Sequence, residues 1–187
     1  MTRIAIFVFF LVSALSLCSC ATNSGPYRHA DPKRRDTAMA ERLTREAADR
    51  IETNPITAEK LLREALAEDP YYGPAHNNLG VLFIEQDRLY EAAAEFEWAR
   101  KLMPGNPEPR LNLGLALEHG GRIDEAIQSY EAALALTPEH LDSLQALVRC
   151  QLRHNRFDSQ IADRLSIIAM RGTPEWSSWA RQRLLEH

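Results

Sequence analysis

Residues 76–104 read HNNLGVLFIEQDRLYEAAAEFEWARKLMP, and residues 110–138 read RLNLGLALEHGGRIDEAIQSYEAALALTP. The second segment repeats the first, with each shared position moved along the chain by a constant step of 34. The shared positions are Leu79, Gly80, Ala92, Phe96, Ala99 and Pro104, which recur as Leu113, Gly114, Ala126, Tyr130, Ala133 and Pro138. A step of 34 backwards finds Ala58, Leu62, Ala65 and Pro70. A fixed period of this length predicts a repeat architecture, in which each unit packs on its neighbours.

The spacing within each unit predicts two short helices joined by a tight turn. In the unit from residue 73 to 106, we expect helices over residues 74–86 and 90–103, and Pro104 ends the second. Small residues let the two backbones approach, and large apolar residues fill the space beside the contact. The packing residues are therefore predicted to be Leu79, Gly80, Phe83, Ala92, Phe96 and Ala99, then Leu113, Gly114, Leu117, Ala126, Tyr130 and Ala133.

In period and residue positions, residues 39–172 resemble the tetratricopeptide repeat (TPR) family, although His76 and Arg110 stand where the family usually has Trp. The resemblance implies an all-α, right-handed superhelix (an α-solenoid) of about four helix pairs plus a C-terminal capping helix. The expected units are two close matches, 73–106 and 107–140, flanked by two degenerate repeats, 37–72 and 141–172. Terminal repeats are often atypical because they cap the core.

The two ends of the expected stack depart from the pattern. In the first unit, strict register would bury charged residues, so we expect a slide of two residues that places Ala47, Ala48 and Ile51 inside, with a shortened turn near Asn54.

Residues 174–187 are predicted to form the capping helix. Trp176, Trp179, Ala180 and Leu184 form one apolar stripe, which either closes the stack or offers an aromatic patch to a partner.

Composition agrees with helices and excludes other classes. Hydrophobic residues make up 45% of the 187 residues, with 25 Ala and 24 Leu but only 4 Val and 10 Ile, which argues against a substantial sheet. The net charge of -4 offers no broad basic surface, so we expect no nucleic-acid partner.

The N-terminus is predicted to be a signal peptide over residues 1–19, because Arg3 precedes an uncharged apolar run over residues 4–17. Leu17-Cys18-Ser19-Cys20 resembles the lipobox of bacterial lipoproteins, which implies cleavage before Cys20 and lipidation of that cysteine. Ordinary cleavage after Ala21 and an uncleaved anchor remain open alternatives.

Residues 20–36 are expected to be a lipidated tether, because Gly, Pro and charged residues replace any apolar period there. A basic contact through Lys33, Arg34 and Arg35 to anionic lipid or cell wall is the alternative. Ala21, where inner-membrane lipoproteins have Asp, implies lipid anchoring at the outer membrane of the cell envelope, facing the periplasm.

No catalytic motif is recognisable, so we expect a protein that is not an enzyme and that needs no cofactor. Along the sequence, none of the six histidines lies in a cluster with metal-ligand spacing, so no metal site is predicted. Cys150 aligns with Ala116 one unit earlier and is expected to be a small buried residue, with a redox role as the less favoured alternative.

The TPR resemblance implies a concave groove lined by the first helix of each unit, which binds a protein or peptide partner. The corresponding positions here are Asn77, Val81, Ile84, Leu111, Leu115, Glu118, Gln145, Arg149 and Leu152. Chaperone-binding members clamp a C-terminal carboxylate with Lys and Asn, where this chain has Val81 and Leu115. We therefore expect no such clamp, and a groove that is apolar in its middle and basic at its C-terminal end, through Arg149 and Arg153. The alternative is that Val81 and Leu115 only support packing, or contact residues 21–36.

These observations together predict a scaffold of the bacterial cell envelope. In plan the chain resembles TPR lipoproteins of pilus and secretion assembly, and also those that organise cell-wall enzymes; a non-catalytic subunit of an envelope enzyme complex is the remaining alternative. The sequence assigns no oligomeric state.

Trp98 is expected on the outer side of its helix, either as an interface residue or covered by long neighbouring side chains.

Overall fold

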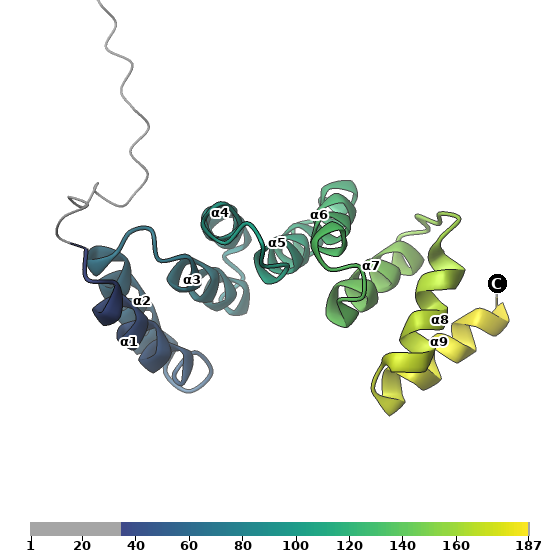
Figure 1. Ribbon diagram of the computed structural model, residues 1–187, viewed down its shortest axis with the longest axis horizontal. Coiled ribbons are helices and arrows are strands. Elements are labelled where there is room, and N and C mark those ends of the chain that lie inside the picture. Colours follow the sequence, from purple (N-terminus) through teal and green to yellow (C-terminus); the bar gives the residue numbers. More distant parts are fainter. Residues whose placement is uncertain (1–34, 187) are drawn as a thin grey trace, which may run out of the picture.

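The computed structural model describes residues 35–186, which contain nine α-helices and no strand (Figure 1). The predicted signal peptide, Cys20 and all but the last two residues of the predicted tether lie outside these residues. The helices are α1 (Thr37–Ala48), α2 (Pro55–Glu68), α3 (Gly73–Glu85), α4 (Leu89–Leu102), α5 (Glu108–His119), α6 (Ile123–Leu136), α7 (Leu141–Arg153), α8 (Ile161–Arg171) and α9 (Pro174–Glu186).

Successive helices pair as hairpins and the hairpins stack along the chain, which confirms the predicted right-handed α-solenoid with a capping helix. No helix within residues 35–186 is long and apolar enough to span a membrane. α3 and α4 begin and end within one residue of their predicted bounds, because proline and turn residues mark the boundaries.

The turn between the two helices of a unit repeats with the same period as the core. Asp87, Gly121 and Asn155 follow one another at that period, and each has a positive φ, of 57°, 75° and 54°. Asp, Gly and Asn are the residues that adopt this left-handed conformation most readily. The amide after each of them bonds back to a carbonyl of the first helix; Arg88 N donates to Phe83 O at 2.8 Å and Arg122 N to Leu117 O at 2.9 Å.

The predicted packing residues of the two central units are all buried. Their small members lie where the helices cross: a Cβ built on Gly80 would lie 2.6 Å from the Phe96 ring, and one on Gly114 would meet the Tyr130 ring even more closely. Glycine at these two positions therefore sets how closely α3 approaches α4, and α5 approaches α6.

The first unit corrects one expectation. Ala47 is buried and Ile51 partly buried, as the two-residue slide predicts, but Ala48 is exposed. α1 ends at Ala48, so residues 49–54 form a turn that is longer, not shorter, than the turns between α3 and α4 or α5 and α6. The physical reason is local, since Pro55 starts α2 and the Asn54 side chain caps it by accepting from Thr57 N at 3.1 Å.

The C-terminal helix α9 covers a separate apolar cluster. Leu144, Val148, Ile161, Leu165 and Ile168 form this cluster together with Ala169 and the fully buried Ala180 of α9. Trp176 and Trp179 pack against it and meet edge to face, with ring centroids 5.2 Å apart. The aromatic stripe therefore closes the stack, as the first of the two interpretations predicts, while Trp176 and Trp179 both stay partly exposed.

Candidate functional site

The first helices of successive units form a common surface, because α1 contacts α3, α3 contacts α5 and α5 contacts α7. We call the surface of α3, α5 and α7 the groove face. Side-chain bonds tie its helices together: Asn112 of α5 donates to Asn77 of α3 at 3.1 Å, and Arg153 of α7 donates to Glu118 of α5 at 2.9 Å. The groove face is thus continuous from the second unit to the fourth.

Six of the nine predicted groove residues are partly exposed on this face, namely Asn77, Val81, Ile84, Leu115, Arg149 and Leu152. Leu111, Glu118 and Gln145 are instead buried, with 6%, 6% and 9% of their surface exposed. This corrects the predicted set, because Leu111, Glu118 and Gln145 are covered by neighbouring parts of the fold and are not exposed on the groove face.

A cavity of about 540 Å³ continues the groove face beyond α7. We call it the basic pocket, and its lining combines three arginines with two aromatic rings. The lining residues are Arg149, Leu152, Arg153, Asn155, Phe157, Trp179, Arg183 and Glu186. Arg183 and Trp179 come from α9, so the capping helix contributes side chains that no single repeat supplies.

The three arginines of the basic pocket differ in their partners. Arg153 pairs with Glu118, and Arg183 pairs with Glu186 at 2.5 Å. The Nε of Arg149 is buried and has no hydrogen-bond partner among residues 35–186. A buried donor without an acceptor is costly, so Arg149 has hydrogen-bonding capacity that the described residues leave unused.

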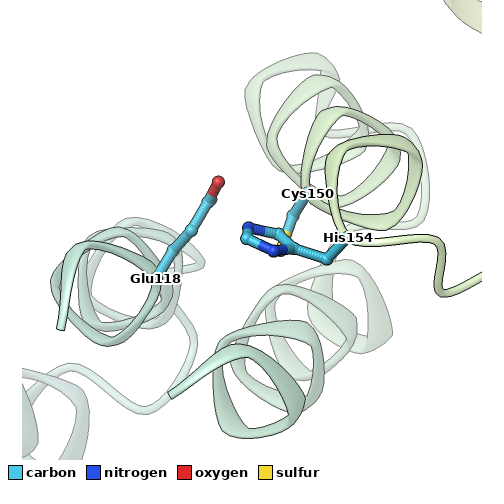
Figure 2. Close-up of side chains that lie close together, drawn as sticks. All are labelled: Glu118, Cys150 and His154. Carbon is cyan, nitrogen blue, oxygen red and sulfur yellow. The ribbon is translucent and has the colours of Figure 1, made fainter. Parts of the chain in front are cut away.

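Glu118, Cys150 and His154 come together between α5 and the end of α7 (Figure 2). Glu118 reaches across from α5, while Cys150 and His154 lie one turn apart at the end of α7, and one potential ligand atom of each lies within 4.8 Å of the others. Local spacing along the sequence does not reveal this cluster, because Glu118 belongs to a different repeat unit from the other two residues. The pair Cys150 and His154, four residues apart at the C-terminal end of α7, is the only part of the cluster that the sequence places close together.

A second group, Glu108, His140 and Asp142, also brings potential ligand atoms within 4.8 Å of one another. It is more open, since Asp142 is exposed. His140 Nε2 lies 3.1 Å from Glu108 Oε1 and its Nδ1 lies 2.8 Å from the Ser143 hydroxyl.

Cys150 is fully buried, as predicted. Burial raises the pKa of the Cys150 thiol to about 11, and the negative charge of Glu118 contributes to this rise. A thiol with such a pKa is protonated at neutral pH, and the thiolate is the reactive form, so Cys150 is a poor redox nucleophile in this state.

Trp98 lies against His76, with ring centroids 5.9 Å apart and planes 19° apart, and Lys101 lies 5.6 Å from its ring. His76 is fully buried; its Nδ1 lies 2.6 Å from Glu95 Oε2, and its Nε2 lies 3.0 Å from the Pro70 carbonyl oxygen. Of the two interpretations of Trp98, the structure therefore favours a ring covered by its neighbours.

The family model of the tetratricopeptide repeat matches residues 55–107, 79–140 and 111–163, and together these ranges cover more than half of the chain. The chain belongs to the tetratricopeptide repeat family. Among curated relatives, PYG7, a chloroplastic TPR domain-containing protein of Arabidopsis thaliana, is 32% identical over 87 residues, which are 44% of this chain and 29% of PYG7. Tetratricopeptide repeat protein 28 of Mus musculus is 29% identical over 97 residues, 52% of this chain and 4% of the relative. The chain thus spans less than a third of either relative.

Solved structures share the fold. The first TPR domain of RPAP3 bound to the HSP90 peptide SRMEEVD superposes with a TM-score of 0.61 at 17% identity, over 65% of this chain and 98% of that one. MamA of Desulfovibrio magneticus RS-1 gives a TM-score of 0.60 at 18% identity, over 68% of this chain and 72% of that one. O-GlcNAc transferase of Thermobaculum terrenum gives 0.65 at 23% identity, over 77% of this chain but only 26% of the enzyme. At these identities the likeness concerns the fold alone. Membership of the tetratricopeptide repeat family, which the family model shows, supports a protein-interaction scaffold.

Proposed function

We propose that the chain is a non-catalytic, lipid-anchored scaffold of the bacterial cell envelope, whose groove face and basic pocket bind one extended segment of a partner protein. The observation that carries the binding proposal is the continuity of the two surfaces. Partly exposed apolar side chains of α3 and α5 lead directly to the basic pocket between α7 and α9.

The chemistry of this surface indicates the chemistry of the segment. Val81, Ile84 and Leu115 favour apolar side chains in the middle of the segment. Arg149, with its buried and unsatisfied Nε, favours a carboxylate at the end that enters the basic pocket, and the nearby Trp179 favours an aromatic or aliphatic neighbour. The peptide in the RPAP3 complex, SRMEEVD, likewise combines acidic and apolar residues, which supports this type of ligand for the fold.

The anchoring proposal is supported by the apolar run over residues 4–17 and by the lipobox-like residues before Cys20. Two or more acyl chains hold a protein at a bilayer almost permanently, because each buried CH₂ contributes about 0.8 kcal/mol. Metabolic labelling with palmitate should mark the wild-type chain and not the Cys20→Ser variant. Label that persists on the variant would contradict lipidation of Cys20.

Affinity capture from solubilised envelopes tests the groove. Leu115→Glu places a charge on the apolar part of the groove face, and Arg149→Glu reverses the charge of the basic pocket. Both substitutions should abolish capture of the same partner protein. The matched control is Leu136→Glu, because Leu136 lies at the end of α6 and is 40% exposed. Circular dichroism would establish that each variant is folded.

A partner lost from both groove variants and kept by the Leu136→Glu control supports the proposal, whereas identical capture by all four chains contradicts groove binding. The identity of the captured protein separates a role in pilus or secretion assembly from a role as adaptor of cell-wall enzymes.

A further inference from the structure

Glu118, Cys150 and His154 supply one carboxylate oxygen, one sulfur and one imidazole nitrogen to a common point between α5 and α7 (Figure 2). These are the three kinds of protein ligand that Zn²⁺ binds, at about 2.0–2.2 Å for oxygen, about 2.0–2.1 Å for nitrogen and about 2.3 Å for sulfur. The potential ligand atoms already lie within 4.8 Å of one another, and binding one ion requires the side chains to move closer together.

The surroundings hold these ligands as a metal site requires. The Tyr130 hydroxyl donates to one oxygen of Glu118 at 2.9 Å and orients the carboxylate, which leaves the other oxygen toward α7. Cys150 lies in the last turn of α7 and His154 is the C-cap residue that follows this helix; the His154 amide donates to the Cys150 carbonyl oxygen at 3.1 Å, which keeps the two residues close together. Glu118 and Cys150 are buried, whereas His154 is partly exposed, so the cluster is shielded from bulk solvent on only part of its surface.

Positive charge is already attracted to this point. Arg153 donates to Glu118 at 2.9 Å, and more than half of the Arg153 side chain is exposed. A divalent cation would take over the charge pairing with Glu118, and Arg153 can turn into the basic pocket, which it already lines.

We propose that Glu118, Cys150 and His154 form a site for a transition-metal dication of the zinc class, with water as the fourth ligand. On binding, the Cys150 sulfur forms the bond to the metal and its thiol proton passes to solvent. The ion links α5 to α7 at the edge of the groove face and releases Arg153 for the basic pocket.

The test uses the full chain without a histidine tag, with Cys18 and Cys20 replaced by serine so that Cys150 is the one thiol in the sequence. Zn²⁺ titration should show one ion bound per chain. Titration with Co²⁺ should produce the near-ultraviolet charge-transfer band of a thiolate bound to cobalt. Cys150→Ser should abolish this band, and His154→Ala should weaken Zn²⁺ binding at least about tenfold, since even the loss of an outer-shell partner costs that much.

Two histidines provide matched controls. His119 is exposed at the end of α5, close to Glu118 in sequence, and His140 belongs to the second carboxylate group, so His119→Ala and His140→Ala should both bind Zn²⁺ as the parent does. Glu118→Gln keeps the side-chain shape and tests the carboxylate in a second way; it should also weaken binding. The proposal is overturned if the parent binds no stoichiometric ion, if the band persists in Cys150→Ser, or if His140→Ala loses the ion while His154→Ala keeps it.

Discussion

At Gly114 the backbone of α5 lies directly against the Tyr130 ring of α6. Tyr130 cannot easily move away, because it is fully buried and its hydroxyl donates to Glu118. The close contact of the two helices depends on the absence of a single Cβ. Glycine recurs at this position of the repeat because a side chain there would collide with the Tyr130 ring. The flexibility of its backbone is not the reason.

Gly114→Ala should destabilise the protein by about 1–2 kcal/mol, because overpacking costs about 1–3 kcal/mol and the better helix propensity of Ala returns up to about 1 kcal/mol. Urea unfolding followed by circular dichroism would measure the change. Gly105→Ala is the control, since a Cβ there meets nothing within 4 Å; an equal effect at both positions would refute the steric argument.

Buried polar residues are the part of the core that spacing did not reveal. His76 lies in α3 and Glu95 lies in α4. At both positions the repeat pattern specifies only the size of the side chain and not its polarity. Their 2.6 Å contact depends on the relative rotation of the two helices, which a list of equivalent positions does not contain. The repeat pattern therefore assigns His76 a packing position but does not identify its partner.

At the scale of the element, the turn between α7 and α8 is held by one carboxylate. Asp158 accepts from Gln151 at 2.8 Å, from Arg164 at 2.6 Å and from the Gln160 amide at 2.9 Å. Burial by itself would raise the pKa of Asp158, but these hydrogen bonds and the charge of Arg164 outweigh it and lower the pKa below its ordinary value. The turn is longer than those of the central units, and Asp158 connects both of its ends, next to a direct bond from Arg164 to Gln151 at 3.3 Å.

Asp158→Asn should lower the free energy of unfolding by about 1–2 kcal/mol at neutral pH, because a charge-assisted acceptor is lost. A lowered folded-state pKa adds stability above the unfolded value, about 3.9, and that stability disappears as the pH falls through the folded value. The difference between wild type and variant should thus be full above about pH 5 and shrink below about pH 4. Thermal unfolding across this range measures it, with Asp163→Asn, on the exposed face of α8, as the control. A difference that does not change with pH would exclude the ionised carboxylate as its cause.

At the scale of the whole molecule, the core is a strip with two parts and not one central cluster. The larger part runs from α1 into α7, and the smaller joins α7, α8 and α9. Leu134 of α6 packs against both and is a point of contact between them. In such a stack stability is transmitted mainly between neighbouring units.

Ile168→Ala should therefore weaken the C-terminal part selectively. Ile168 is fully buried in the smaller cluster, and its truncation costs about 2–5 kcal/mol. Native-state hydrogen exchange should show faster exchange in α7, α8 and α9, with α3 and α4 nearly unchanged. Equal acceleration in all helices would instead indicate a single cooperative unit.

The sequence by itself determined the period of the repeat, the helical hairpins, their small and large packing residues and the presence of a further helix after the last repeat. These features depend on local helix propensity and on the spacing of residues along the chain, and both can be determined from the sequence. Only the tertiary structure decided that Leu111 and Gln145 are buried, that α9 completes the basic pocket, and that Glu118 meets Cys150 and His154. Those contacts depend on the rotation of each hairpin relative to the next, which results from the packing of all the units together.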